Sequence, residues 1–101
     1  MEIRFLDESD FSKAINTDKP VLIDFYAAWC DSCRTLDPII YEFAQENPQV
    51  DVYKLNVDDN MDIANLYGIM SVPTVMVMEG KKVKNKATGS ITKEDIEELL
   101  Q

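Results

Sequence analysis

The two cysteines of the chain, Cys30 and Cys33, stand three residues apart and are the residues best suited to chemistry. On a helix, positions i and i+3 lie on one face about one turn apart, and a rise of ~1.5 Å per residue brings their Cα atoms within disulfide range. Such a pair can open and close with little movement of the backbone. The spacing therefore predicts thiol–disulfide exchange.

Cys30 follows an apolar run and precedes a helical pattern, so we expect it where a strand ends and a helix begins. Unpaired N–H groups and the positive end of the helix dipole at such a place stabilise a thiolate, the attacking species in exchange. We therefore predict Cys30 as the nucleophile. Cys33, expected to be deeper, resolves the mixed disulfide and releases the reduced substrate.

Two other uses of the cysteines stay open: they could simply pack, or they could bind a metal shared between two chains. A zinc site within one chain is disfavoured, because the sequence has no histidine and zinc usually needs four ligands. We predict no metal and no other cofactor.

Composition is that of an ordinary globular domain. The chain has 101 residues, of which 46% are hydrophobic and 29% are charged, and this length fits one domain. The net charge of -9 disfavours nucleic acid and anionic membrane surfaces as partners, since both attract basic proteins. The acidity then serves either docking to proteins with basic patches or solubility alone.

The sequence also bears on the compartment. Charged residues interrupt Met1–Asp7 before an apolar stretch of signal-peptide length develops, and no segment approaches the span of a membrane helix. Two cysteines do not make the framework of structural bridges that small secreted domains need. We expect a cytoplasmic protein, whose cysteine pair is catalytic in a reducing environment.

The cysteines need a strand before them and a helix behind them, and the apolar pattern supplies both. Val21–Ala27 is apolar almost throughout, as in a central strand covered on both faces, and Asp24 is the exception. Apolar residues recur at helical spacing from Arg34 to Asn47.

The remaining elements follow from the same patterns. They are a short edge strand at Ile3–Leu6, a helix at Glu8–Asn16, a strand at Val50–Val57, a helix at Asn60–Tyr67 closed by Gly68, a hairpin of Thr74–Met78 and Lys82–Ala87, and a helix from a Thr92 cap to Leu100. The order βαβαβαββα predicts an α/β fold with parallel crossovers first and a hairpin last.

The chain resembles the thioredoxin family from end to end. The stretch Val21–Cys30 is similar to the family's strand and its approach to the active site, Tyr67–Thr74 resembles its proline loop, and Gly89 also falls where the family has a glycine. The resemblance implies the thioredoxin fold, a central mixed sheet of about five strands flanked by four helices, as a single domain over residues 1–101. It also implies a monomeric protein-disulfide reductase that acts on disulfide-containing proteins and is recycled by a flavin-dependent thioredoxin reductase.

Asp24 is a carboxylate in an otherwise apolar strand. Burying its charge without a partner would cost several kcal/mol, so we expect its pKa to be raised. By resemblance, Asp24 assists proton transfer to and from Cys33, and Lys54 matches the family's lysine near that aspartate. The alternative is a structural aspartate held by an ion pair or by hydrogen bonds.

The resemblance further implies a shallow apolar surface on which substrates dock, made by Trp29, Ile69, Val72, Pro73 and Gly89. Pro73 resembles the family's cis-proline, and a cis bond would leave the backbone of Val72 free to pair with an extended substrate segment. A trans proline that starts a strand, and a Trp29 that only packs on the loop, are the alternatives.

Between the cysteines the chain has Asp31-Ser32, where thioredoxins usually have Gly-Pro. Ser32 can hydrogen-bond locally, and Asp31 suits a helix N-terminus but places negative charge beside Cys30. We expect this repulsion to disfavour the Cys30 thiolate and to make the pair more reducing, so that the protein donates electrons. A disulfide oxidase or isomerase, and a redox-inactive thioredoxin-fold binding module, are the alternatives.

The methionines are expected to fill gaps in the core rather than to act as ligands. This applies most clearly to Met76 and Met78, which alternate in a strand, and also to Met61 and Met70.

Overall fold

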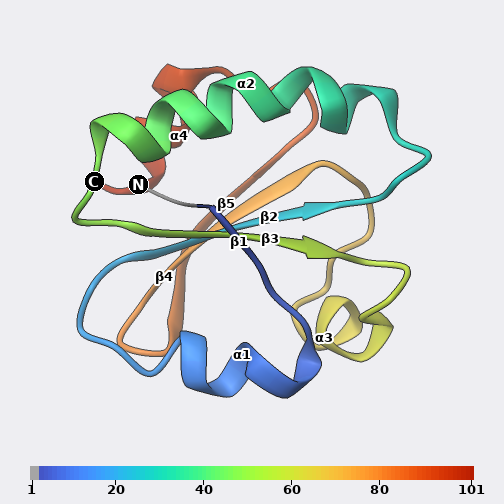
Figure 1. The fold of residues 1–101 in the computed structure, drawn as a ribbon, viewed down its shortest axis with the longest axis horizontal. Coiled ribbons are helices and arrows are strands. Elements are labelled where there is room, and N and C mark those ends of the chain that lie inside the picture. The colour runs from blue at the N-terminus through green and yellow to red at the C-terminus, as the bar shows by residue number, and fades with distance from the viewer. Residues whose placement is uncertain (1–2) are drawn as a thin grey trace.

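A computed structural model describes residues 3–101 of the chain, and these residues form five strands and four helices around one mixed sheet (Figure 1). The elements are β1 (Arg4–Phe5), α1 (Glu8–Ala14), β2 (Val21–Tyr26), α2 (Asp31–Glu46), β3 (Asp51–Asn56), α3 (Met61–Leu66), β4 (Thr74–Glu79), β5 (Lys82–Thr88) and α4 (Lys93–Leu99). The βαβαβαββα order predicted from the sequence is confirmed.

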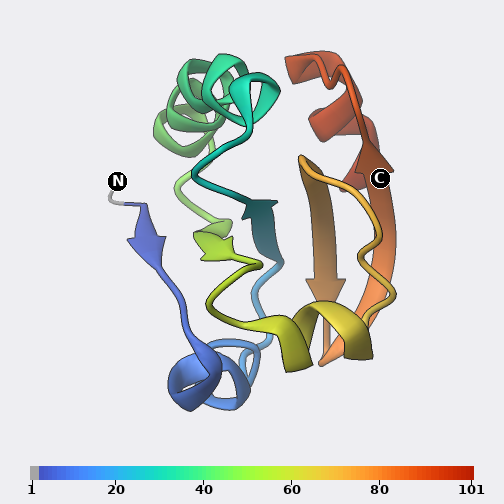
Figure 2. The same cartoon turned by 90° about the vertical axis from the view of Figure 1, so that its right-hand side faces the viewer.

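The sheet has the strand order β1-β3-β2-β4-β5. Strands β1, β2 and β3 run parallel, whereas β4 is antiparallel to both β2 and β5. Helices α2 and α4 cover one face of the sheet and α1 and α3 the other, so β2, in the middle of the sheet, is covered on both faces (Figures 1 and 2). This position explains why its sequence is apolar almost throughout.

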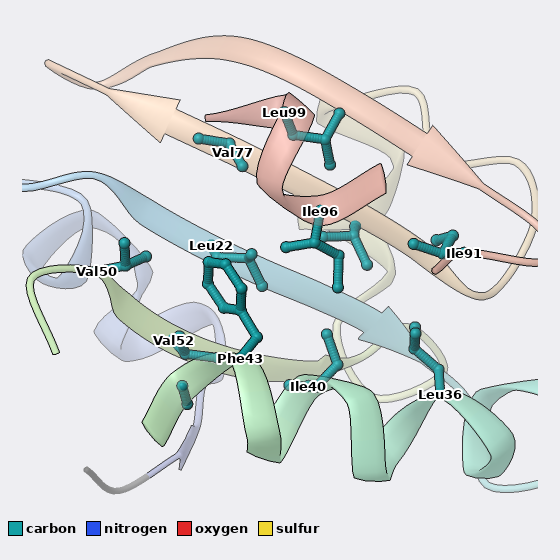
Figure 3. Packing of buried hydrophobic residues seen from close by; sticks show 12 residues of the cluster. Leu22, Leu36, Ile40, Phe43, Val50, Val52, Val77, Ile91, Ile96 and Leu99 are labelled. Carbon is teal, nitrogen blue, oxygen red and sulfur yellow. The ribbon is translucent and has the colours of Figure 1, made fainter. Parts of the chain in front are cut away.

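Side chains of β2 alternate between two apolar clusters, one on each face. Leu22 packs with Ile40 and Phe43 of α2 and with Ile96 of α4 (Figure 3). Ile23 and its opposite-face neighbours pack with residues of α1, β3 and β4. Because alternate residues of a strand point to the same face, Asp24 is on the α2 face with Leu22.

The long helix α2 begins at Asp31, so the prediction of a helix starting at Arg34 was wrong by most of a turn. Cys30 is the N-cap, and its Sγ accepts a hydrogen bond from the N–H of Cys33 at 3.1 Å. Apart from the buried Cys33, the first turn carries polar, exposed residues, and a search for apolar periodicity therefore does not detect it. The first helix ends at Ala14 instead of Asn16, because Asn16 donates its N–H to Lys13 in a closing turn.

Turns and caps fix the other boundaries. Gly80 and Lys81 both have positive φ, 58° and 68°, as a tight two-residue hairpin between β4 and β5 requires. Gly68 has φ of 66°, and the N–H of Ile69 donates to the Ala64 carbonyl at 2.9 Å, which closes α3. Thr92 begins α4 in a capping box with Asp95.

The methionine prediction holds for only two of the four residues. Met76 and Met78 are buried in β4, whereas Met61 is 63% and Met70 96% exposed. Met61 opens α3 and Met70 lies in the loop before Pro73, and both are exposed there. Within residues 3–101, no helix has both the length and the apolar character needed to cross a bilayer.

Candidate active site

Cys30 and Cys33 form a disulfide at the amino end of α2, with their Cα atoms 5.3 Å apart. The end of β2 and the turn after it deliver Cys30 to the N-cap position, and the first turn of the helix places Cys33 behind it. The N–H of Cys33 points at the Cys30 sulfur, as it would at a thiolate, and the helix dipole acts in the same direction. This end of the helix can therefore stabilise a charged Cys30 after reduction.

Both cysteines are buried in the disulfide form. Cys30 is 5% and Cys33 3% exposed, so Cys33 is deeper as expected, but by a smaller margin than the two roles imply. Cys30 is covered because its sulfur is bonded to Cys33 and lies 3.3 Å from Ser32 Oγ and 3.8 Å from the carbonyl oxygen of Val72. The Ser32 hydroxyl is thus within hydrogen-bond reach of the Cys30 sulfur.

The charge of Asp31 is paired. Its carboxylate binds the guanidinium of Arg34 one turn along α2, and Arg34 also donates to the Ala28 carbonyl at 2.8 Å. Both side chains are largely exposed. The repulsion that the sequence predicts between Asp31 and a Cys30 thiolate is therefore partly offset by a cation that sequence analysis did not consider.

Asp24 is fully buried in the middle of β2. Within residues 3–101, neither of its carboxyl oxygens has a hydrogen-bond partner. Burial raises the pKa of Asp24 to about 7, with the positive charge of Lys54 acting to lower it and the negative charge of Asp37 acting to raise it. The expected raised pKa is confirmed, and a group with this pKa can exchange protons at neutral pH.

Lys54 is directly opposite Asp24 on the neighbouring strand β3, so their side chains share the α2 face of the sheet. The Lys54 ammonium nevertheless forms its ion pair with Asp37 of α2. The same Nζ lies 4.6 Å from the centre of the Tyr26 ring. The structure thus brings Lys54 close to Asp24, as expected, while bonding it to a residue that sequence analysis did not single out.

Trp29 is 70% exposed beside Cys30, and its indole Nε1 donates to Asp58 at 2.9 Å. With Ile69 and Val72 it borders a shallow cavity of about 120 Å³. The complete lining is Trp29, Val57, Ile69, Met70, Ser71 and Val72. Three of the five residues expected to form the docking surface therefore line one cavity, together with Val57, Met70 and Ser71.

The other two expected docking residues lie apart from that cavity. The Val72–Pro73 peptide bond is cis, as predicted, and Pro73 is buried, lining neither this cavity nor the next. Gly89 borders a second cavity of about 360 Å³, which Ser32 also lines. Because Trp29 lines one cavity and Ser32 the other, the cysteine segment borders both.

Four residues at the site escaped sequence analysis, and two of them carried a detectable signal. Arg34 follows Asp31, which the sequence did single out, at the spacing of a helical ion pair, and the exposed Met70 directly follows Ile69 in the proline loop. Asp37 and Asp58 belong to contacts that join separate elements, namely α2 to β3 and Trp29 to the loop after β3. No local pattern marks those two.

Comparisons with known proteins agree with this geometry. The model of the family Thioredoxin matches residues 2–101. The chain is 43% identical over 96 residues to a thioredoxin of Alicyclobacillus acidocaldarius, covering 94% of this chain and 91% of that one. It is 38% identical over 90 residues to thioredoxin-1 of Saccharomyces cerevisiae, covering 89% and 87%.

A solved structure of a mutant thioredoxin from Halobacterium salinarum superposes with a TM-score of 0.89, at 26% identity, covering 97% of this chain and 87% of that one. The fold, the cysteine pair at the start of α2 and these similarities agree. The chain therefore belongs to the thioredoxin family and is a thiol–disulfide oxidoreductase of the kind that reduces protein disulfides.

Proposed function

We propose that the protein is an electron donor in which Cys30 is the nucleophile and Cys33 the resolving thiol. The Cys30 thiolate attacks one sulfur of a substrate disulfide, and the other substrate sulfur leaves as a thiolate and takes up a proton. Cys33 then loses its proton and attacks Cys30, which forms the Cys30–Cys33 disulfide and releases the second substrate thiol. The substrate disulfide gains two electrons and the cysteine pair loses two.

One observation carries this assignment of roles: Cys30 is the N-cap of α2, and the Cys33 N–H donates to its sulfur. A sulfur at this position is stabilised as a thiolate by an N–H group and by the helix dipole. Cys33 lies within the first turn, and its own N–H serves the neighbouring sulfur. Cys30 is therefore the better leaving group as well as the better nucleophile.

Asp24 is the group we assign to proton exchange with Cys33. It is on the same face of the sheet as α2, and its pKa near 7 allows it to accept a proton during resolution and return it later. The burial of Asp24 and the lack of hydrogen-bond partners for its carboxyl among residues 3–101 support this role over that of a structural aspartate. In this proposal Lys54 moderates the pKa of Asp24 by its charge.

Substrates dock, in this proposal, beside Trp29, with apolar side chains in the cavity lined by Ile69 and Val72. Within residues 3–101, neither the N–H nor the carbonyl of Val72 is hydrogen-bonded to another backbone group, so both are available to an extended substrate segment. The Gly89 N–H donates to the Pro73 carbonyl at 3.2 Å, which ties the loop before α4 to the proline loop. Pro73 and Gly89 thus support the proline loop that carries the docking surface without lining the cavity themselves.

Asp31 and Ser32 tune the reactivity of Cys30 in opposite directions. The negative charge of Asp31 opposes the thiolate, within the limit set by its pairing with Arg34. The Ser32 hydroxyl, 3.3 Å from Cys30 Sγ, can donate a hydrogen bond to it. The proposed direction, reduction of substrates, follows if the Asp31 charge has the larger effect.

We further propose a cytoplasmic monomer that a flavin-dependent thioredoxin reductase recycles. The support is that both cysteines of the chain are used in the reactive pair, which suits a compartment where thiols stay reduced. The net charge of -9 favours partner proteins with basic docking surfaces. No cofactor enters the reaction, since the electrons are carried by the two sulfurs.

The test is reduction of insulin disulfides, followed by turbidity, with dithiothreitol and then with purified flavin-dependent thioredoxin reductases as the electron source. The protein is expected to accelerate precipitation of the insulin chains, whereas Cys30→Ser is expected to be inactive. Activity retained by Cys30→Ser would contradict the assignment of Cys30 as the nucleophile. A reduction potential at the oxidising end of the family would instead support the oxidase or isomerase alternative.

A further inference from the structure

We propose that Asp37 is a positioning residue that withholds the Lys54 ammonium from the Asp24 carboxyl and so keeps Asp24 available for proton exchange. The inference rests on the proposed function of Asp24 and goes beyond it, because it names the residue that controls this group. Asp37 is on α2, one turn beyond Cys33, and its carboxylate is paired with Lys54.

The register of the sheet places Asp24 and Lys54 where an ion pair between them would be expected. They are paired residues of adjacent strands, and side chains at such positions lie close together on one face. A buried carboxyl beside a lysine is normally bonded to it, because burying either charge alone is unfavourable. Both oxygens of Asp24 nevertheless lack a hydrogen-bond partner among residues 3–101.

The contacts of Lys54 explain this exception. Its Nζ is bonded to Asp37 and lies 4.6 Å above the Tyr26 ring and 5.9 Å from the centre of the Phe5 ring. The side chain of Lys54 is only 6% exposed, whereas that of Asp37 is 31% exposed. The ammonium is therefore held by a partly solvated carboxylate and two aromatic rings, and it forms no ion pair with the buried aspartate within residues 3–101.

Two charged groups act on Asp24, one on the neighbouring strand β3 and one on the helix α2. Lys54 on β3 lowers the pKa of Asp24, and Asp37 on α2 raises it, both on top of the larger effect of burial. From β4 the residue opposite Asp24 is Val75, which is apolar and fully buried. Asp37 thus opposes ionisation of Asp24 twice, through its own negative charge and by binding the Lys54 ammonium, the cation that acts on Asp24 within residues 3–101.

The direction of the expected change follows from these contacts. Asp37→Asn removes the negative charge and frees the ammonium to approach Asp24, and both changes favour the ionised form of Asp24. The pKa of Asp24 is therefore expected to fall by about one unit. If Asp37 only fastens α2 to β3, its loss lowers stability and leaves the pKa of Asp24 where it is.

The experiment is a ¹³C-carboxyl NMR titration of Asp24 in the full-length oxidised protein, with Asp37→Asn, Asp37→Glu and Glu42→Gln as variants. Asp37→Glu keeps a carboxylate for Lys54 and should retain the parent pKa. Glu42→Gln is the matched control, since it removes one carboxylate from the same helix, where Glu42 pairs with Lys93 and not with Lys54. Should Asp37→Asn fail to fold, Asp37→Ser, with a neutral side chain too short to reach Lys54, takes its place.

A lower pKa of Asp24 in Asp37→Asn alone supports the proposal. An unchanged or raised pKa in that variant, or an equal fall in Glu42→Gln, overturns it. A second measurement follows the pH dependence of the step in which Cys33 resolves a mixed disulfide, whose acidic limb should move to lower pH by the same amount. The titration needs no substrate, so its failure is distinguishable from failure of the proposed reductase activity in the insulin assay.

Discussion

The guanidinium of Arg34 is paired with the carboxylate of Asp31 across the first turn of α2, next to the sulfur of Cys30. The Arg34 charge partly offsets the Asp31 charge at Cys30, so removing one of the two exposes the effect of the other. The pair is exposed, and its interaction is therefore screened by salt.

Removing Asp31 and removing Arg34 should shift the pH dependence of Cys30 reactivity in opposite directions. Asp31→Gly is expected to lower the pH midpoint for alkylation of Cys30 in the reduced protein, because Arg34 is left as an uncompensated cation. Arg34→Gln is expected to raise it, because Asp31 is left as an uncompensated anion. Each change should be about 0.2 to 0.7 pH unit at low salt and smaller at high salt.

The measurement is the rate of iodoacetamide alkylation as a function of pH. Lys93→Gln serves as the control for Arg34→Gln, because it removes one positive charge from α4, where Lys93 pairs with Glu42 and Glu46. A midpoint that is unchanged or raised in Asp31→Gly would contradict the prediction that the charge of Asp31 disfavours the Cys30 thiolate.

The order of the two cysteines predicts which variant traps a substrate. Cys33→Ser keeps the nucleophile but cannot resolve, so it should accumulate a stable mixed disulfide between Cys30 and an oxidised substrate protein. Cys30→Ser should form none, because Cys33 is 3% exposed and lies behind the N-cap. Non-reducing gel electrophoresis and mass spectrometry of the adduct would check this. An adduct formed equally well by both variants would contradict the assignment of Cys30 as the nucleophile and Cys33 as the resolving thiol.

The buried carboxyl of Asp24 predicts a pH-dependent stability. Its pKa is 3.8 ordinarily and about 7 in the folded protein, so below about pH 4 it is protonated in both states and has no effect on the balance. As the pH rises from about 4 to about 7, only the unfolded chain releases the proton, and this group lowers the free energy of unfolding by up to about 4 kcal/mol. Above pH 7 the loss is complete.

Asp24→Asn removes that titration. The variant should therefore gain stability relative to the parent between pH 4 and pH 7, whatever fixed cost its buried amide introduces. Urea unfolding of the oxidised proteins at a series of pH values measures the difference. Asp62→Asn, which removes a carboxylate at an exposed position of α3, is the control, and the gain between pH 4 and pH 7 should be larger in Asp24→Asn than in this variant. A stability difference for Asp24→Asn that does not vary with pH would mean that the pKa of Asp24 is not raised in the native state.

The exposed ring of Trp29 predicts a defect confined to large substrates. Trp29→Ala removes one wall of the cavity beside Cys30 and should raise the KM for insulin several-fold, with little effect on a small disulfide such as dithionitrobenzoate. Leu66→Ala is the matched control, since Leu66 is 72% exposed but does not line that cavity. Equal losses on both substrates would show that Trp29 supports the cysteines instead of binding the protein substrate.

Much of the site was predictable because its signals are local. The spacing of Cys30 and Cys33, the carboxylate of Asp24 in an apolar strand and the cap at Thr92 each reflect short-range geometry, which a sequence displays directly. The start of α2 was misplaced for the same reason, since its first turn is polar and a search for apolar periodicity passes over it.

Contacts between residues that are far apart in the sequence could not be predicted in this way, because only the folded chain brings them together. Lys54 and Asp37 are 17 residues apart and meet because α2 packs on the face of the sheet that Lys54 shares with Asp24. Met70 looked like a core residue, and its exposure depends on the path of the loop before Pro73.

The sequence by itself determined the order of the elements, the reactive pair and the presence of a carboxyl in the central strand, because periodicity and caps act over a few residues. The tertiary structure alone decided which charge Lys54 binds and which apolar side chains stay exposed beside Cys30. Those outcomes depend on distances between elements that come together only when the sheet and its helices pack.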